Sequence, residues 1–115
     1  MREEIKKYKE EYYQIGQVIC PSLNDEKVYF NNHGFNHLIR KRGVKRYVWD
    51  SNRRFKLLKY AKIIIESVDV QIEYRKSKQE FWTLIKVINN KKIKIVLRRI
   101  SGGRIHFYSI FDIKN

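Results

Sequence analysis

Hydrophobic side chains recur with helical spacing at the start of the chain. Over residues 2–15 they recur every three or four positions, with lysines and glutamates between them. This periodicity predicts an amphipathic helix, and Gly16 and Pro21 then end it. The predicted apolar stripe consists of Ile5, Tyr8, Tyr12 and Ile15.

A second helix is expected after a short β-prone stretch at Val28–Phe30. Asn31 or Asn32 can accept the hydrogen bond that begins a helix, and Gly43 is typical of the position just beyond a helix end. The sequence therefore predicts a helix over His33–Lys41.

The next segment, residues 44–51, is expected to be a basic loop with an exposed aromatic residue, Trp49. Ser51 or Asn52 then caps a third predicted helix, at about 53–66. Its apolar face consists of Phe55, Leu58, Ala61 and Ile65.

The pattern changes after Ser67, where Val, Ile, Tyr and Phe become dense. The β-rich stretches are 70–76, 81–89, 92–100 and 104–111, and their turns are Ser77-Lys78-Gln79, Asn89-Asn90 and Gly102-Gly103. They predict a four-stranded antiparallel β-meander. Because helices come first, we expect one α+β domain over 1–115, with about three N-terminal helices packed on one face of the sheet.

A two-residue turn at Gly102-Gly103 would fix the register of the last two strands, pairing Arg99 with His106 and Arg98 with Phe107. One face then holds Trp82, Leu84, Ile95, Leu97, Tyr108 and Ile110, with Arg99 and His106 near the turn. The other holds Thr83, Lys94, Arg98, Phe107 and Ser109. We expect the first face to pack against the helices and the second to suit an RNA-binding cleft, although a bulge near the glycines would exchange some positions.

Charge narrows the class of partner. The chain has 26 Lys and Arg against 12 Asp and Glu, a formal net charge of +14. Such an excess favours a polyanion, with nucleic acid first and a membrane surface second. We find no apolar run long enough to span a membrane and no signal peptide. The lone Cys20 excludes an internal disulfide and is expected to be a buried, inert thiol.

The segment around the second helix carries the most informative chemistry. On a helix, His33, His37, Arg40 and Lys41 share one side. Imidazole moves protons and guanidinium neutralises charge, so this face suits a phosphate group. A merely solvated basic face is the alternative. The HxxxH spacing also permits zinc, but no Glu lies between the histidines and few carboxylates lie nearby, so we expect no metal and no cofactor.

Two stretches of the second half resemble a known group. They are Lys94-Ile95-Val96-Leu97-Arg98-Arg99-Ile100 and Gly102-Gly103-Arg104-Ile105-His106-Phe107-Tyr108-Ser109-Ile110. With Tyr29–Lys41, the Arg53-Arg54 helix and the strand starting Phe81-Trp82, they are similar to small phage-associated and toxin-associated ribonucleases of the barnase, EndoU, colicin and RelE-like superfamily. The similarity spans about residues 28–111. It implies helices followed by a four-stranded antiparallel sheet, and metal-independent RNA cleavage.

Such cleavage needs a base for the 2′-hydroxyl, cations for the phosphorane and an acid for the leaving 5′-oxygen. We assign His37 as one acid/base group, and His106 as the other or as a base-contacting residue. Arg98 and Arg40 would stabilise the phosphate, and Ser109 would donate to a non-bridging oxygen. Nearby cations should lower a histidine pKa. Residues expected to contact RNA without catalysing are Lys41, Arg53, Arg54, Lys94, Arg99 and His33; Tyr74 and Trp49 can stack on bases or simply pack.

The predicted function is a toxin-like or phage-associated endoribonuclease that forms 2′,3′-cyclic phosphate ends and acts in the cytoplasm. The predicted partners are RNA and an acidic antitoxin or immunity protein. The alternatives are a non-catalytic nucleic-acid-binding module, which the charge alone would explain, and a toxin-like domain that is regulated by a partner. The histidines discriminate, because a pure binder has no use for His37 and His106 together.

Overall fold

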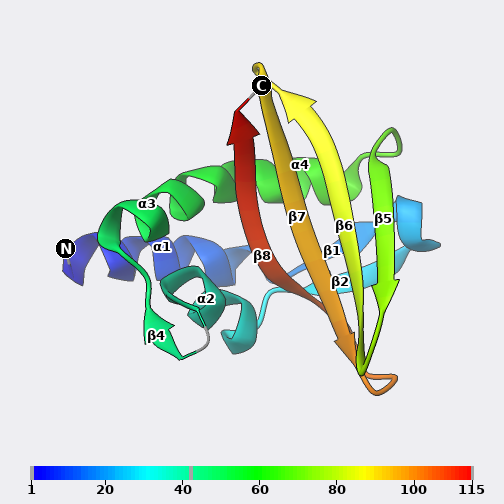
Figure 1. Ribbon diagram of the computed structural model, residues 1–115, viewed down its shortest axis with the longest axis horizontal. Helices are drawn as coiled ribbons and strands as arrows, with labels where there is room; N and C mark the ends of the chain where they lie inside the picture. The colour runs from blue at the N-terminus through cyan, green and yellow to red at the C-terminus, as the bar shows by residue number, and fades with distance from the viewer. Residues whose placement is uncertain (1, 42, 115) are drawn as a thin grey trace.

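The computed structural model describes residues 2–41 and 43–114, and Figure 1 shows their arrangement. The helices are α1 (Arg2–Ile15), α2 (Asn32–Ile39), α3 (Val48–Leu57) and α4 (Ala61–Glu66), with 3-10 turns at Pro21–Leu23 and Leu58–Tyr60. The strands are β1 (Gln17–Cys20), β2 (Glu26–Tyr29), β3 (Arg40–Lys41), β4 (Val44–Lys45), β5 (Gln71–Lys76), β6 (Gln79–Ile88), β7 (Lys91–Ile100) and β8 (Ile105–Lys114).

The predicted four-stranded antiparallel meander is wrong as a description of the fold. In the described residues one mixed sheet has six strands, in the order β1-β2-β8-β7-β6-β5, and β3 and β4 form a separate hairpin. β5 to β8 do form an antiparallel meander. However, β2 joins β8 in parallel, through Val28 opposite Ile105 and Tyr29 opposite His106. β1 and β2 have four residues each, and neither shows the strict apolar–polar alternation that identifies a strand; only the β-prone stretch at Val28–Phe30, which overlaps β2, was predicted.

The helices also depart from the prediction after α1. Asn31 caps α2 by accepting from the Gly34 amide at 3.2 Å. α2 ends at Ile39 rather than Lys41, because the chain turns into the β3–β4 hairpin around Gly43. The predicted loop at 44–51 is wrong as well.

That stretch contains β4 and the start of α3, which begins five residues before the predicted position. Tyr47 is the N-cap and makes no side-chain capping bond; its carbonyl accepts from the amides of Asp50 and Ser51, at 3.1 Å each. Neither Ser51 nor Asn52 is the cap, and Ser51 is buried inside the helix. The start was missed because Tyr47 carries none of the usual capping groups.

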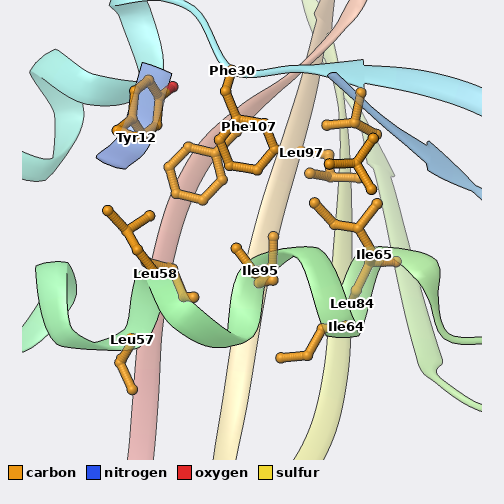
Figure 2. Close-up of a cluster of buried hydrophobic side chains, with 14 of the residues drawn as sticks. Tyr12, Phe30, Leu57, Leu58, Ile64, Ile65, Leu84, Ile95, Leu97 and Phe107 are labelled. Atoms are coloured by element: carbon orange, nitrogen blue, oxygen red, sulfur yellow. The ribbon is translucent and has the colours of Figure 1, made fainter. Parts of the chain in front are cut away.

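The core lies between the sheet and the helices α3 and α4, as Figure 2 shows. The helices contribute Phe55, Leu57, Leu58, Ala61, Ile64 and Ile65, and the strands contribute Leu84, Ile93, Ile95, Leu97, Phe107 and Ile110. Phe30 stacks on Phe107 with 5.0 Å between ring centroids. Cys20 is fully buried, and its burial raises the pKa of the thiol, as expected for an inert cysteine.

The ladder between β7 and β8 contains a bulge, so the predicted register near the turn is wrong. Arg98 lies opposite His106 and Leu97 opposite Phe107, whereas Val96 lies opposite Ser109. Tyr108 is therefore the additional residue on β8.

The register differs because the turn is not a two-residue turn. The Gly103 amide donates to the Ile100 carbonyl at 2.8 Å, and both Ser101 and Gly102 have positive φ. The loop is therefore longer by one residue, and Phe107 turns into the core. The bulge then places His106, Tyr108 and Ser109 together on the opposite face, where they join Arg98.

Beyond its two pairs with β2, one edge of β8 is covered by α2 and α3 instead of by a strand (Figure 1). Gly34 brings the α2 backbone against this edge. A Cβ at this position would collide with the Phe107 carbonyl and the Tyr12 hydroxyl. The same Tyr12 hydroxyl donates to the Asn31 carbonyl at 2.7 Å. The close contact between α2 and β8 thus requires glycine, which has no Cβ, at position 34.

We expect Gly34→Ala to lower the free energy of unfolding by about 2 kcal/mol, because overpacking a closed site costs about 1–3 kcal/mol. Alanine would gain at most about 1 kcal/mol in helix propensity, which does not offset the collision. Urea denaturation measures the change. The matched control is Asn36→Ala, on the exposed side of α2, for which we expect a change within about 0.5 kcal/mol. Equal stability of the two variants would contradict the close contact between α2 and β8.

Candidate active site

The polar face of the sheet opens into a cleft of about 530 Å3 beside α2 and the first turns of α3. Its lining includes His37, Lys41, Arg46, Arg54, Phe81, Tyr108 and Ser109. These residues come from α2, β3, the connection between β4 and α3, α3 itself, β6 and β8. The cleft thus collects side chains from segments that are far apart in the sequence.

Arg46 connects α2 to α3. It is 9% exposed. Its Nε donates to the His37 carbonyl at 2.9 Å, and its Nη1 donates to Asp50 Oδ2 at 3.1 Å. Its Nη2 lies 3.4 Å from His37 Nδ1. Guanidinium can only donate, so Nδ1 carries the acceptor lone pair of this ring and directs it at Arg46.

Arg54 connects α3 to β8, one helical turn after Asp50. Its Nε donates to Asp50 Oδ1 at 3.2 Å, and its Nη1 donates to Ser109 Oγ at 2.8 Å and to the Ile110 carbonyl at 3.3 Å. One carboxylate therefore lies between two guanidinium groups. Burial opposes ionisation of Asp50, but Arg54 and Arg46 outweigh it and lower the pKa of this carboxyl. Arg46, Asp50 and Arg54 together therefore carry a net positive charge beside the cleft.

Tyr108 lies between two other parts of the site. Its ring centroid is 4.2 Å from that of His37, and the Arg98 guanidinium carbon lies 4.6 Å from the same ring. Arg98 Nε donates to His106 Nε2 at 3.0 Å. The His33 and His106 rings are 6.0 Å apart. Tyr108 therefore contacts His37 on one side and Arg98, the partner of His106, on the other.

Both inner histidines are neutral at physiological pH. Burial is the first cause that lowers the pKa of His37 to about 4, followed by Arg46, Arg54 and Arg98. Burial and then Arg98 lower the pKa of His106 to about 4, against a smaller opposing effect of a hydrogen bond with the Arg104 backbone. Cations do lower both values, as expected, but burial contributes more.

The structure brings together only some of the predicted site residues. His37, Arg98, His106, Ser109, Arg54 and Lys41 lie in or against the cleft, with His33 exposed beside His106. Lys94 is on the same sheet face, farther from the β7–β8 turn.

Three predicted residues point elsewhere. Arg40 is exposed on β3 and does not line the cleft. Arg53 Nε lies 3.4 Å from an oxygen of Asp112. Arg99 Nη2 lies 2.8 Å from Glu80 Oε1, with its guanidinium over the Trp82 ring.

Sequence reasoning missed Arg46, Asp50 and Tyr108. Arg46, Asp50 and Arg54 are four residues apart, the spacing that aligns side chains on one helix face. That signal was present, but the segment was interpreted as a loop. Tyr108 was assigned to the core face because no sequence signal locates the bulge.

A larger cavity of about 650 Å3 lies between α1 and α3. Its lining is rich in lysine, with Lys7, Lys56, Lys59, Lys62 and Lys91, and among the described residues around it there is no histidine. Chemistry rather than size therefore selects the smaller cleft as the candidate active site. Within the described ranges, no group of three or more His, Cys, Asp or Glu residues is placed to hold a metal ion.

Comparison with known proteins adds no relative: no family model, curated protein or solved structure matches the chain. The resemblance to toxin-associated ribonucleases therefore stays a prediction. In the part of the chain that the structure describes, no helix is long and apolar enough to cross a membrane.

The lowered histidine pKa values predict how stability depends on pH. An unfolded histidine binds its proton near pH 6.5, whereas His37 and His106 bind theirs near pH 4. Their contribution to stability is complete above pH 6.5 and is lost as the pH falls towards 4. Urea midpoints should fall over that window, and the double variant His37→Gln/His106→Gln should flatten the fall. A wild-type midpoint that stays constant from pH 7 to pH 4.5 would contradict the burial of neutral imidazoles.

Proposed function

We propose that the chain is a metal-independent endoribonuclease that cuts RNA by transesterification. The supporting observation is that a neutral histidine, His37, shares one cleft with the guanidinium groups of Arg46 and Arg54. Arg98 lies against the Tyr108 ring of the same cleft. In this reaction the 2′-oxygen attacks the adjacent phosphorus and the bond to the 5′-oxygen breaks. The products are a 2′,3′-cyclic phosphate and a free 5′-hydroxyl.

His37 is the proposed base. Its low pKa keeps the imidazole unprotonated at physiological pH, as a proton acceptor must be. The accepting atom is Nδ1, where the 2′-hydroxyl would replace Arg46 Nη2, whose contact with this nitrogen is long at 3.4 Å. A 2′-hydroxyl that donates to Nδ1 would have its phosphate beside the Arg46 guanidinium. Proton transfer and charge neutralisation would then occur at one place.

The arginines are the proposed charge-stabilising groups. A guanidinium presents a planar fork of donors that matches the oxygens of a phosphate. Arg46 and Arg54 share a single carboxylate, Asp50, so their combined charge exceeds its own. Ser109 Oγ accepts from Arg54, which leaves its hydroxyl hydrogen free to donate to a non-bridging oxygen. Fixed donors of this kind stabilise charge as it develops.

The proposed acid is the Tyr108 hydroxyl rather than His106. Nε2 of His106 accepts from Arg98, and the ring also has a hydrogen bond with the Arg104 backbone. Both nitrogens are therefore engaged, and His106 acts as a positioning residue for Arg98. Tyr74 also lines the cleft, but its hydroxyl donates to Glu80 at 2.7 Å. Tyr108 is thus the cleft phenol with an uncommitted proton among the described contacts.

The biological setting follows from the resemblance and not from the cleft. The resemblance favours a toxin-like or phage-associated nuclease that acts on cytoplasmic RNA, with an acidic antitoxin or immunity protein as inhibitor. The net charge of +14 complements either partner. A binding module without catalysis remains the contrasting function, and the following experiment separates the two.

Purified protein is incubated with total RNA in EDTA, and cleavage rates are compared among variants. We expect His37→Ala and Tyr108→Phe each to slow cleavage about 100-fold or more, the usual effect of removing a general acid or base. Tyr108→Phe retains the ring that packs on His37. The control is Lys78→Ala, in the exposed β5–β6 turn, for which wild-type rates are expected.

Two outcomes would contradict the proposal. Salt-sensitive RNA binding without cleavage, on every RNA class tested, would establish the binding module. Full activity of both His37→Ala and Tyr108→Phe would place the chemistry outside this cleft.

A further inference from the structure

An exposed aromatic pair lies next to the cleft and takes no part in the core. Tyr47 is 77% exposed and Trp49 is 66% exposed. Val44, at 70%, and Val48, at 42%, are exposed in the same segment of the chain. Contiguous exposure of large apolar side chains is typical of an interaction site.

The geometry of the two rings indicates what they bind. The Tyr47 and Trp49 rings are nearly parallel, with an interplanar angle of 9°, and their centroids are 6.4 Å apart. Stacked bases repeat at about 3.4 Å, so a base between two aromatic rings needs a separation of about twice that distance. The centroid distance of 6.4 Å is an upper limit on the separation of the ring planes and falls short of that value, so the pair offers two parallel, exposed faces on which a base can stack.

The pair is held close to the candidate active site. Arg46 precedes Tyr47 and contacts His37, and Asp50 follows Trp49 and contacts Arg46. Arg46 and Asp50 thus anchor the two ends of this segment, and the Tyr47 and Trp49 rings between them are exposed. The Tyr47 carbonyl also closes the first turn of α3. Each ring is therefore one residue away in sequence from a side chain of the site.

Charge around the pair favours a polyanion. Lys41 lines the cleft and Lys45 is exposed on β4, directly before Arg46. Asp50, the carboxylate next to Trp49 in sequence, is already bonded to two arginines. A protein partner would complement the apolar area or the charge, but it has no particular use for two parallel, exposed aromatic rings. Single-stranded nucleic acid uses both features.

We propose that Tyr47 and Trp49 hold one nucleobase of a single-stranded RNA whose adjacent phosphate lies in the cleft. This inference rests on the proposed function and names its substrate class: unpaired RNA, positioned by stacking rather than by hydrogen bonds to a base edge. Stacking tolerates every base, so the pair fixes where the strand lies more than which sequence is cut.

Trp49 fluorescence tests the proposal. The chain has two tryptophans, so a Trp82→Phe background leaves Trp49 as the only reporter. The probes are 2′-O-methyl oligouridylate, which lacks the attacking hydroxyl, and an abasic oligonucleotide of the same length and charge. We expect the base-bearing probe to quench Trp49 and the abasic probe not to. Tyr47→Ala should weaken binding about 5-fold to 100-fold, and the exposed control Val68→Ala should not weaken it.

The result that overturns the proposal is equal binding of the two probes, or binding without any change in Trp49 emission. Either one would leave the patch as a contact for protein. The outcome is independent of catalysis: base-dependent quenching in a protein that cuts no RNA would support the aromatic pair and refute the nuclease. Cleavage with no change in Trp49 emission would support the nuclease and refute the aromatic pair as a base-binding site.

Discussion

The candidate active site depends on one irregularity in hydrogen bonding, the bulge at Tyr108 in the β7–β8 ladder. Without it, Tyr108 and Ser109 would point to opposite faces of the sheet, because side chains alternate along a strand. With it, both join His106 and Arg98 on the polar face, while Phe107 is buried against Phe30. Bulges are common beside active sites for this reason.

The same edge of β8 explains how the helical residues of the site are held. β2 pairs with only the first residues of β8, and the edge beyond is taken up by Gly34 and by the bond from Arg54 to the Ile110 carbonyl. α2 and α3 thus contact the strand backbone directly, and His37 and Arg54 are positioned by that contact. The arrangement buries several like charges: burial and Arg46 lower the pKa of Arg54 itself. A bound phosphate would relieve this repulsion, so the free protein keeps an unfavourable cluster for which an anion is the natural complement.

Sequence reasoning located the long elements and some of the chemistry. The bounds of α1, the cap at Asn31 and the approximate positions of β5 to β8 agree with the structure, because each carries a strong local signal of periodicity or capping. It failed where the determinant is not local. β1 and β2 are stabilised by pairing rather than by pattern, the start of α3 lacks a capping side chain, and the bulge follows from a loop one residue longer than expected. His37, Arg98 and Ser109 were predicted because their residue types suggest the chemistry. Arg46 and Asp50 were not, because residues 44–51 were interpreted as a loop, whereas Asp50 lies in α3 and Arg46 just before it.

The central claim is that this cleft converts RNA to cyclic phosphate ends with a buried neutral histidine as base. The most direct measurement is the identification of the ends formed when the wild-type protein cuts a short RNA in EDTA, by mass spectrometry and 31P NMR. We expect a 2′,3′-cyclic phosphate on one fragment and a 5′-hydroxyl on the other, with no cleavage of the same oligonucleotide carrying 2′-deoxy sugars. Fragments with 5′-phosphate and 3′-hydroxyl ends, or cleavage of the deoxy substrate, would contradict it.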